Sequence, residues 1–222
     1  MADQVKHPGR LIAIDGSRGK DTAAAAAAVV EALKADGIAC AISRFDASGL
    51  FTELAAAARG DRHISTRTLT LVYAADLAFR LRWEIRPVLE AGGVVVAAPY
   101  VETTVAFGAA CGLSESWIRE LLRFAPKADA RGRAEERKLA RGWKARTDRG
   151  YAEYCAALLE SSAPKLASKR ARRDAMALLD KPGGRTVHRL SEKGVDQLAR
   201  AVRNSLRATP SRPRARSRNG RR

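Results

Sequence analysis

The sequence predicts an α/β domain built on a parallel sheet, and three observations support this prediction. Short apolar segments alternate with segments of helical character along the chain. Val94–Ala98 is apolar throughout, which is typical of a strand buried on both faces of a parallel sheet. Leu11–Asp15 is apolar up to its last residue, and a glycine-rich turn and an alanine-rich helix follow it directly. The chain therefore begins in the order strand, turn, helix.

Local signals set the limits of the other predicted elements. Thr22–Ala35 is rich in alanine, which favours helix, and Gly37 ends it. Thr66–Glu90 carries apolar residues at helical spacing and ends before Gly92. The remaining predicted helices are Leu50–Ala58, Val101–Ala110, Glu115–Arg123, Gly150–Glu160 and Val195–Leu206, and the remaining predicted strands are Ala39–Phe45 and Thr186–Leu190.

Charge divides the chain into two parts. Residues 1–130 hold 15 Lys and Arg against 15 Asp and Glu, whereas residues 131–222 hold 26 against 9 and so carry the whole net charge of +17. The length of 222 residues fits one domain, predicted at 1–208. Residues 209–222 are rich in Arg, Pro and Ser and predict a disordered basic tail. Two interpretations of this tail stay open: it binds nucleic acid through phosphate contacts, or it only keeps the chain soluble.

Several classes of protein are excluded by composition. No apolar run reaches the roughly 20 residues that a membrane-spanning helix needs, so no membrane partner is expected. Cys40, Cys111 and Cys155 lie far apart and form no CxxC pair, which favours a reduced, cytoplasmic protein. The three histidines are equally scattered, and this argues against a metal site of Cys and His residues.

The turn after Leu11–Asp15 has the chemistry of a phosphate-binding loop. Glycines let backbone N–H groups converge on a phosphate, a helix N-terminus adds partial positive charge, and a lysine reaches the terminal phosphates. The usual pattern is G-x-x-x-x-G-K-[ST]. Ile14 stands at the position of its first glycine, Asp21 replaces the hydroxyl residue that binds Mg²⁺, and Thr22 comes one place late. The predicted loop residues are Gly16, Ser17, Arg18, Gly19, Lys20, Asp21 and Thr22.

An ordered series of segments resembles the thymidylate kinases, which are P-loop nucleoside monophosphate kinases. Leu11–Thr22 (LIAIDGSRGKDT) resembles E-G-x-D-G-x-G-K-[ST]-T, with Arg18 as a one-residue insertion. Gly93–Phe107 is similar to G-x-V-V-I-x-D-R-Y-x-x-S-x-x-A-Y. The other matching segments are Ser43–Phe45, Leu71–Leu89 and Arg141–Leu159. The resemblance implies a divergent member with a P-loop kinase-like parallel sheet wrapped by helices, and a basic lid at about 131–150.

The resemblance implies phosphoryl transfer from ATP–Mg²⁺ to a nucleoside monophosphate, with dTMP as the default acceptor, and a homodimer. The implied catalytic residues are Lys20, Asp15 and Arg149. Arg146 and the loop residues would bind ATP, Asp21 and Thr22 would bind the metal, and Arg44, Tyr100, Thr104 and Phe107 would bind the acceptor. Other interpretations stay open, since Asp15 fits equally well as a helix-capping acid and Asp21 as the mark of a loop that no longer binds nucleotide.

The chain departs from the family pattern at several charged positions. The pair D-R is Ala98-Pro99, and the arginine of A-A-D-R is Leu77. The apolar strand expected before the lid is not visible in Ala125–Arg133, and Met176–Asp180 is the alternative place for it. Because arginines that neutralise phosphate charge are absent, the alternative function is an impaired or inactive relative. Such a relative would bind nucleotide, or nucleic acid through its basic C-terminal half.

Overall fold

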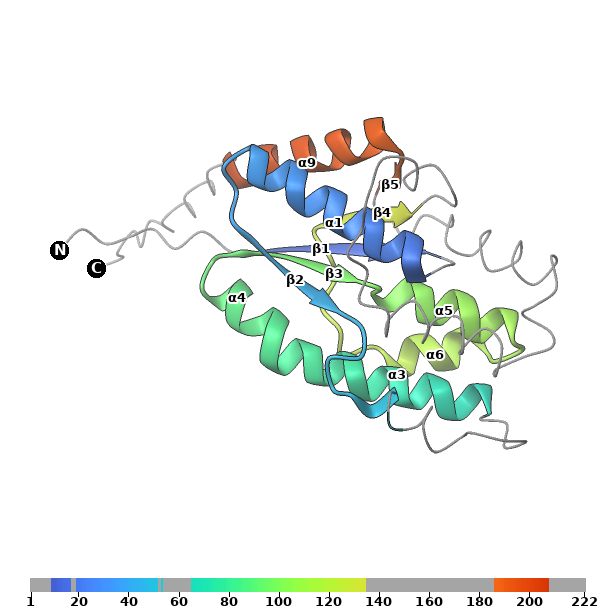
Figure 1. The fold of residues 1–222 in the computed structure, drawn as a ribbon. Helices are drawn as coiled ribbons and strands as arrows, with labels where there is room; N and C mark the ends of the chain where they lie inside the picture. The colour runs from blue at the N-terminus through green and yellow to red at the C-terminus, as the bar shows by residue number, and fades with distance from the viewer. Residues whose placement is uncertain (1–8, 17–18, 52, 54–64, 135–185, 208–222) are drawn as a thin grey trace, which may run out of the picture.

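A computed structural model describes residues 9–16, 19–51, 53, 65–134 and 186–207. Its five strands form one sheet in the order β2-β3-β1-β4-β5, and every neighbouring pair is parallel (Figure 1). The strands are β1 (Arg10–Asp15), β2 (Cys40–Arg44), β3 (Val94–Ala98), β4 (Ala130–Ala134) and β5 (Val187–Leu190). The predicted α/β fold with a parallel sheet is confirmed.

Helices connect these strands and cover both faces of the sheet. They are α1 (Gly19–Ala35), α3 (Thr66–Arg80), η1 (Leu81–Ile85), α4 (Arg86–Glu90), α5 (Val101–Ala110), α6 (Glu115–Leu121) and α9 (Glu192–Arg207). The predicted helix Thr66–Glu90 is continuous but contains a π turn, η1, in which the Arg86 N–H donates to the Leu81 carbonyl. Pro87 follows this turn and has no N–H, so the regular hydrogen-bond ladder cannot continue through it.

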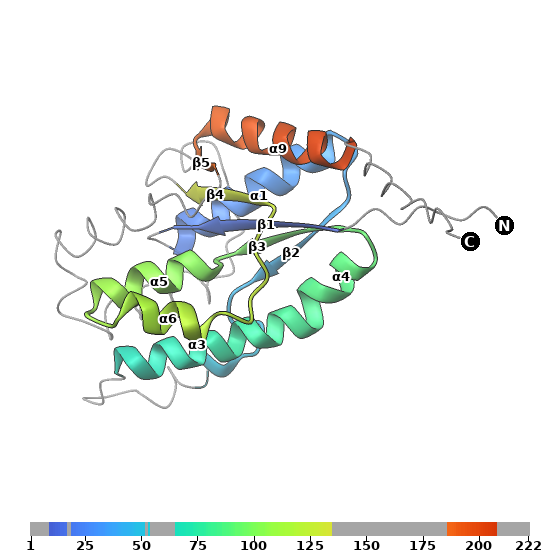
Figure 2. The same cartoon turned by 180° about the vertical axis from the view of Figure 1, so that it is seen from behind.

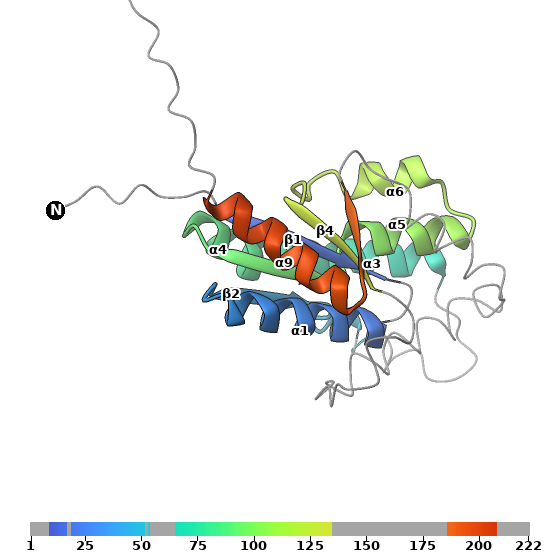
Figure 3. The same ribbon diagram turned by 90° about the horizontal axis from the view of Figure 1, so that it is seen from above.

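Two apolar cores lie on opposite faces of the sheet. Ile12 and Ile14 of β1 point into the core shared with α1 and α9, whereas Leu11 and Ala13 point into the core shared with α3, α5 and α6. Figures 1 and 2 show α1 and α9 on one side of the sheet and the long α3–α4 helix on the other. Figure 3 shows α9 running beside α1. Arg203 of α9 forms an ion pair of 2.7 Å with Asp36, the residue that follows α1. Each fully buried aliphatic side chain contributes about 1.5–3 kcal/mol to this packing.

Strand β4 corrects one prediction. Residues 125–133 showed no apolar strand, yet Ala130–Ala134 pairs with β1 on one side and with β5 on the other. Its sequence, ARGRA, lacks the run of large apolar residues that usually signals a buried strand. Such residues are not needed at Gly132, because the Leu190 side chain of β5 occupies the space that a Cβ atom would need there. The basic segment predicted at about 131–150 therefore begins inside a strand.

Several predicted elements lie in parts of the chain that the structure does not describe. Most of Leu50–Ala58 and all of Gly150–Glu160 lie outside the described residues, as do the alternative strand Met176–Asp180, the remainder of the predicted lid and the basic tail at 209–222. Among the helices that the structure describes, none is long and apolar enough to cross a membrane.

Gly194 of α9 lies very close to the backbone of β5, and this gives a stability prediction. A Cβ atom at this position would overlap the carbonyl oxygen of Arg189, which belongs to β5. Gly194→Ala is therefore expected to destabilise the protein by about 2 kcal/mol, although alanine gains about 1 kcal/mol in helix propensity. Urea denaturation measures this change. The matched control, Asn204→Ala on the exposed side of α9, should leave stability unchanged or slightly raised. A Gly194→Ala variant as stable as the wild type would contradict the packing described.

Candidate functional site

The carboxyl ends of the parallel strands meet at one edge of the sheet, which we call the carboxyl edge. Helix α1 leaves β1 on one face, whereas α5 leaves the neighbouring strand β3 on the opposite face. The crevice between two such strands is the topological switch point, where α/β proteins usually bind ligands. The structure brings Asp15, Gly16, Arg44 and Tyr100 to this edge. Four of the residues predicted from sequence therefore lie at the place that the topology favours for a site.

Asp15 connects the end of β1 to the start of α5. Its side chain is 3% exposed, and its Oδ1 atom accepts hydrogen bonds from the Tyr100 N–H (2.9 Å), the Thr103 N–H (2.9 Å) and the Thr103 hydroxyl (2.7 Å). The Thr103 hydroxyl in turn accepts from the Gly16 N–H at 3.2 Å. Burial raises the pKa of Asp15 above its usual value of 3.8, and the bonds from Thr103 and Tyr100 oppose that rise. Asp15 thus caps α5, and a catalytic role for it remains a prediction.

Strand β1 and helix α1 set the limits of the glycine segment between them. Ile14 pairs with Gly132 inside the sheet, so the turn begins at Gly16 rather than at Ile14, and α1 begins at Gly19. Only two residues then separate the glycines, whereas the usual pattern has four. Gly16 packs directly against the Thr22 hydroxyl, which leaves no space for a Cβ atom at position 16.

The first turn of α1 carries the predicted metal ligands. Asp21 is buried there, and a carboxylate in the first turn complements the partial positive charge of the helix N-terminus. Thr22 is 1% exposed because it lies under Gly16. Within the described ranges, no group of three or more His, Cys, Asp and Glu residues is placed to hold a metal ion. Mg²⁺ seldom needs such a group, since one or two carboxylates, water and substrate phosphates usually bind it.

Other predicted residues are placed in part or not at all. Lys20 is the second residue of α1, and only its position in the helix is described. Ser17, Arg18, Arg146 and Arg149 lie outside the described residues. Their roles stay predictions.

The predicted acceptor-binding residues differ in how accessible they are. Tyr100 is 3% exposed, its hydroxyl donates to the Pro126 carbonyl (2.8 Å), and its own carbonyl accepts from the Tyr73 hydroxyl (2.8 Å). Burial raises the pKa of Tyr100 well above its usual range. Thr104 is buried on α5, and Phe107 on the same helix is half-buried. Tyr100 therefore belongs to the core beneath the site, and contact of these side chains with an acceptor remains a prediction.

Two arginines, Arg44 and Arg133, lie at the carboxyl edge of the sheet. Arg44 ends β2, level with Ala98 of β3, and its side chain is exposed. Arg133 lies level with Asp15 on β4, and the sequence analysis missed it because β4 lacks an apolar pattern. Thr103 was also not predicted as a site residue. It stands at the position of the serine in the family pattern Y-x-x-S, and this match is the signal in the sequence that points to it.

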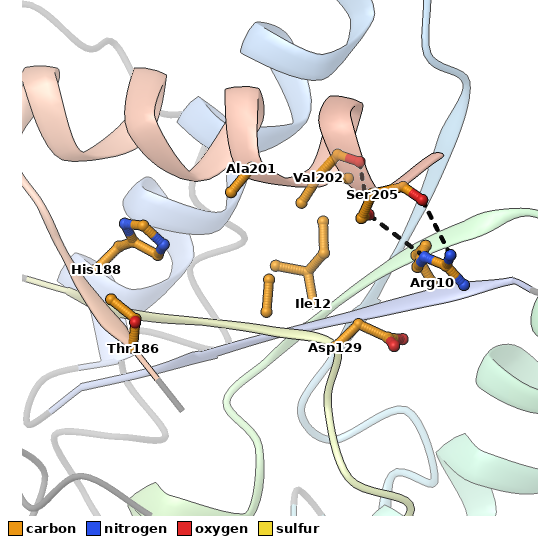
Figure 4. A pocket seen from close by; sticks show the side chains of 9 residues that line it. Arg10, Ile12, Asp129, Thr186, His188, Ala201, Val202 and Ser205 are labelled. Atoms are coloured by element: carbon orange, nitrogen blue, oxygen red, sulfur yellow. Dashed lines mark hydrogen bonds between the residues drawn. The ribbon is translucent and has the colours of Figure 1, made fainter. Parts of the chain in front are cut away.

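A cavity of about 430 Å³ lies at the opposite edge, between α9 and the amino ends of the strands (Figure 4). Arg10 and Asp129 stand at one end of it and His188 at the other. Ser205 holds the Arg10 guanidinium, which donates from Nε to the Ser205 hydroxyl (3.3 Å) and from Nη2 to the Ser205 carbonyl (3.1 Å). No residue predicted to bind nucleotide lines this cavity.

Comparison with known proteins points to one family. No protein-family model matches the chain. A probable thymidylate kinase of Sulfurisphaera tokodaii is 30% identical over 120 residues, which is 54% of this chain and 60% of the relative. A thymidylate kinase of Rhizorhabdus wittichii is 32% identical over 119 residues, 51% of this chain and 57% of the relative. One of Leifsonia xyli is 32% identical over 126 residues, 54% of this chain and 59% of the relative. The chain thus matches little more than half the length of these relatives.

Proposed function

Since the chain is a divergent thymidylate kinase-like protein, we propose that it transfers a phosphoryl group from ATP–Mg²⁺ to a nucleoside monophosphate, with dTMP as the default acceptor. One observation carries the proposal: strand β1, Gly16 and the N-terminus of α1 meet at the topological switch point of the sheet. A glycine turn at a helix N-terminus can offer N–H groups and partial positive charge to a phosphate. Arg44, the residue predicted to bind the acceptor, lies at the same edge of the sheet, at the end of β2 and level with Ala98 of β3.

The residues at the start of α1 fit a phosphate donor in part. Gly16, Gly19 and the helix N-terminus offer N–H groups and partial positive charge, and Lys20 adds a full charge. Asp21 fits a triphosphate only with Mg²⁺ between the two, because its carboxylate would otherwise repel the phosphates. Thr22 fits less well as a metal ligand because its hydroxyl is buried against Gly16. We therefore assign the metal to Asp21 first.

The proposed reaction forms one bond and breaks one. A phosphate oxygen of the monophosphate attacks the γ-phosphorus of ATP, the bond from that phosphorus to ADP breaks, and a nucleoside diphosphate results. The protein contributes by positioning the two substrates and by stabilising the charge on the transferring group. In this proposal Lys20 stabilises that charge from the donor side and Arg44 binds the acceptor phosphate. As the family resemblance implies, Arg146 would bind ATP and Arg149 would stabilise charge on the transferring group.

A second candidate is an impaired or inactive relative. Ala98-Pro99 and Leu77 replace charged residues of the family pattern, and Leu77 is fully buried in the apolar core. Removing one preorganised charge from a site costs about 10²–10³ in rate, so these losses would leave little activity unless other arginines compensate. The excess of basic residues after position 130 favours binding of nucleic acid by such a relative.

The homodimer implied by the family resemblance is part of the proposal. Three large apolar side chains on the α3–η1 helix are exposed, namely Leu71, Phe79 and Trp83, and Trp83 is 64% exposed. An exposed apolar surface of this kind is typical of an interaction site.

A coupled assay of ADP release tests the function. The acceptors are dTMP, dUMP, UMP, CMP, AMP and GMP, each with ATP–Mg²⁺. We expect turnover with dTMP above the rate without acceptor. In parallel, binding of a single-stranded DNA oligonucleotide is measured at 50 and 200 mM salt. No turnover with any acceptor, together with DNA binding that weakens steeply with salt, would favour the second candidate and contradict the first.

A further inference from the structure

Arg80 places a fully buried guanidinium beneath the carboxyl edge. It is the last residue of α3, and its side chain is 0% exposed. Its Nη2 atom donates to the carbonyls of Ser43 and Pro99, at 3.0 Å each, and its Nε atom donates to the Ser43 hydroxyl at 2.9 Å. One side chain therefore bridges the ends of the neighbouring strands β2 and β3.

The charge of Arg80 is balanced inside a connected polar network. Asp76 lies one helical turn earlier, with its Oδ2 atom 3.9 Å from Arg80 Nη1. Its Oδ1 atom accepts from the N–H and the hydroxyl of Ser48, at 2.9 and 2.8 Å. Glu84 accepts from the Ser43 hydroxyl at 2.7 Å. A buried arginine is costly unless such partners surround it, so this network is a specific arrangement of the fold.

The two carbonyls that Arg80 holds precede two residues predicted to bind the acceptor. Ser43 precedes Arg44, and Pro99 precedes Tyr100. Pro99 also stands where the family pattern has an arginine, and Leu77, the other such position, lies one helical turn before Arg80. Arg80 thus lies beneath the region where both arginines are absent.

We propose that Arg80 is a positioning residue for acceptor binding: by fixing the ends of β2 and β3, it orients Arg44 toward the acceptor phosphate. It does not touch the acceptor, because it is fully buried. This inference rests on the proposed function, since it requires that the carboxyl edge binds a nucleoside monophosphate.

The proposal differs from a purely structural role in one measurable respect. A residue that only stabilises the fold would leave acceptor affinity unchanged, or would change it by the same factor whether or not Arg44 is present. A residue that acts through Arg44 would matter much less once Arg44 is removed, because interacting residues give non-additive effects.

A double-mutant cycle in dTMP affinity tests this, measured by isothermal titration calorimetry on the wild type, Arg80→Lys, Arg44→Ala and the double variant. Arg80→Lys keeps a charge beside Asp76 but loses the planar group that reaches both carbonyls. We expect Arg44→Ala to weaken binding about tenfold and Arg80→Lys about fivefold, with the double variant within about twofold of Arg44→Ala. The matched control, Arg82→Lys on the exposed side of the same helix, should leave the affinity unchanged.

The outcomes separate the two proposals. A wild type that does not bind dTMP would contradict the proposed function and this inference with it. A wild type that binds dTMP, with additive effects of Arg80→Lys and Arg44→Ala, would overturn this inference alone.

If the Arg80 variants do not fold, hydrogen exchange at the Arg80 Nε–H of the wild type is measured by NMR. Saturating dTMP should slow this exchange, because coupling between binding and positioning is reciprocal, and unchanged exchange would overturn the inference.

Discussion

Lys20→Ala is expected to lower the rate of phosphoryl transfer to dTMP by about 10²–10³-fold, because it removes the positive charge nearest to the transferred group in the proposed site. The fold should remain intact, since alanine favours helix at least as well as lysine does at this position in α1. Steady-state kinetics of purified wild type and variant measure the change. The loss should appear mainly in kcat, because the lysine is proposed to act on charge that develops in the transition state.

Lys34→Ala is the matched control for this experiment. Lys34 lies in the last turn of the same helix, where it is exposed and forms an ion pair of 3.2 Å with Glu31. Its removal should leave kcat and KM within about twofold of the wild type, because Lys34 lies at the opposite end of α1 from the proposed site and its exposed ion pair contributes little to stability. A Lys20→Ala variant as active as Lys34→Ala would contradict the assignment of Lys20.

Asp15→Ala is expected to destabilise the protein by about 3 kcal/mol, the largest stability effect that we predict. The substitution leaves the N–H groups of Tyr100 and Thr103 and the Thr103 hydroxyl without their acceptor in a buried environment. Urea denaturation at pH 7 measures this loss. Asp36→Ala is the control, because the Asp36–Arg203 pair is partly exposed and should contribute no more than about 1 kcal/mol.

The same comparison has an expected dependence on pH. Burial raises the pKa of Asp15 in the folded protein above 3.8, so the folded state holds this proton more tightly than the unfolded state does. The part of the Asp15 contribution that depends on its proton is therefore fully present at low pH and is lost as pH rises through the folded pKa, whereas the hydrogen bonds that its Oδ1 atom accepts remain at pH 7. The difference in unfolding free energy between wild type and Asp15→Ala should be larger at pH 4.5 than at pH 7. A difference that shrinks on acidification would show that hydrogen bonding to the carboxylate outweighs burial.

Apolar pattern was enough to predict most of the fold. Val94–Ala98 and Val101–Ala110 have the predicted limits, because a fully apolar strand and the helix that follows it leave little ambiguity. Strand β4 could not be predicted in this way, since its small and basic residues fit only because Leu190 fills the space above Gly132. The pattern of apolar residues shows which side chains a segment itself buries. It does not predict a strand such as β4, where the apolar side chains that cover the segment belong to its neighbours.

The candidate site was predictable only in part. The order of strand, glycine turn and helix correctly brought Asp15 and Gly16 to the carboxyl edge. The contacts of Asp15 with Thr103, and those of Arg80 with Ser43 and Pro99, join residues that lie far apart in the chain. No local spacing signals such pairs, because the topology of the sheet creates them.

The most direct test of the proposed function is transfer of label from [γ-³²P]ATP to unlabelled dTMP in the presence of Mg²⁺, with products separated by thin-layer chromatography. This measurement distinguishes transfer from simple hydrolysis of ATP, which release of ADP alone does not. The proposed function predicts labelled dTDP, formed in equal amount to ADP and absent when dTMP is omitted. Label that stays in ATP, or appears only as inorganic phosphate, would contradict it.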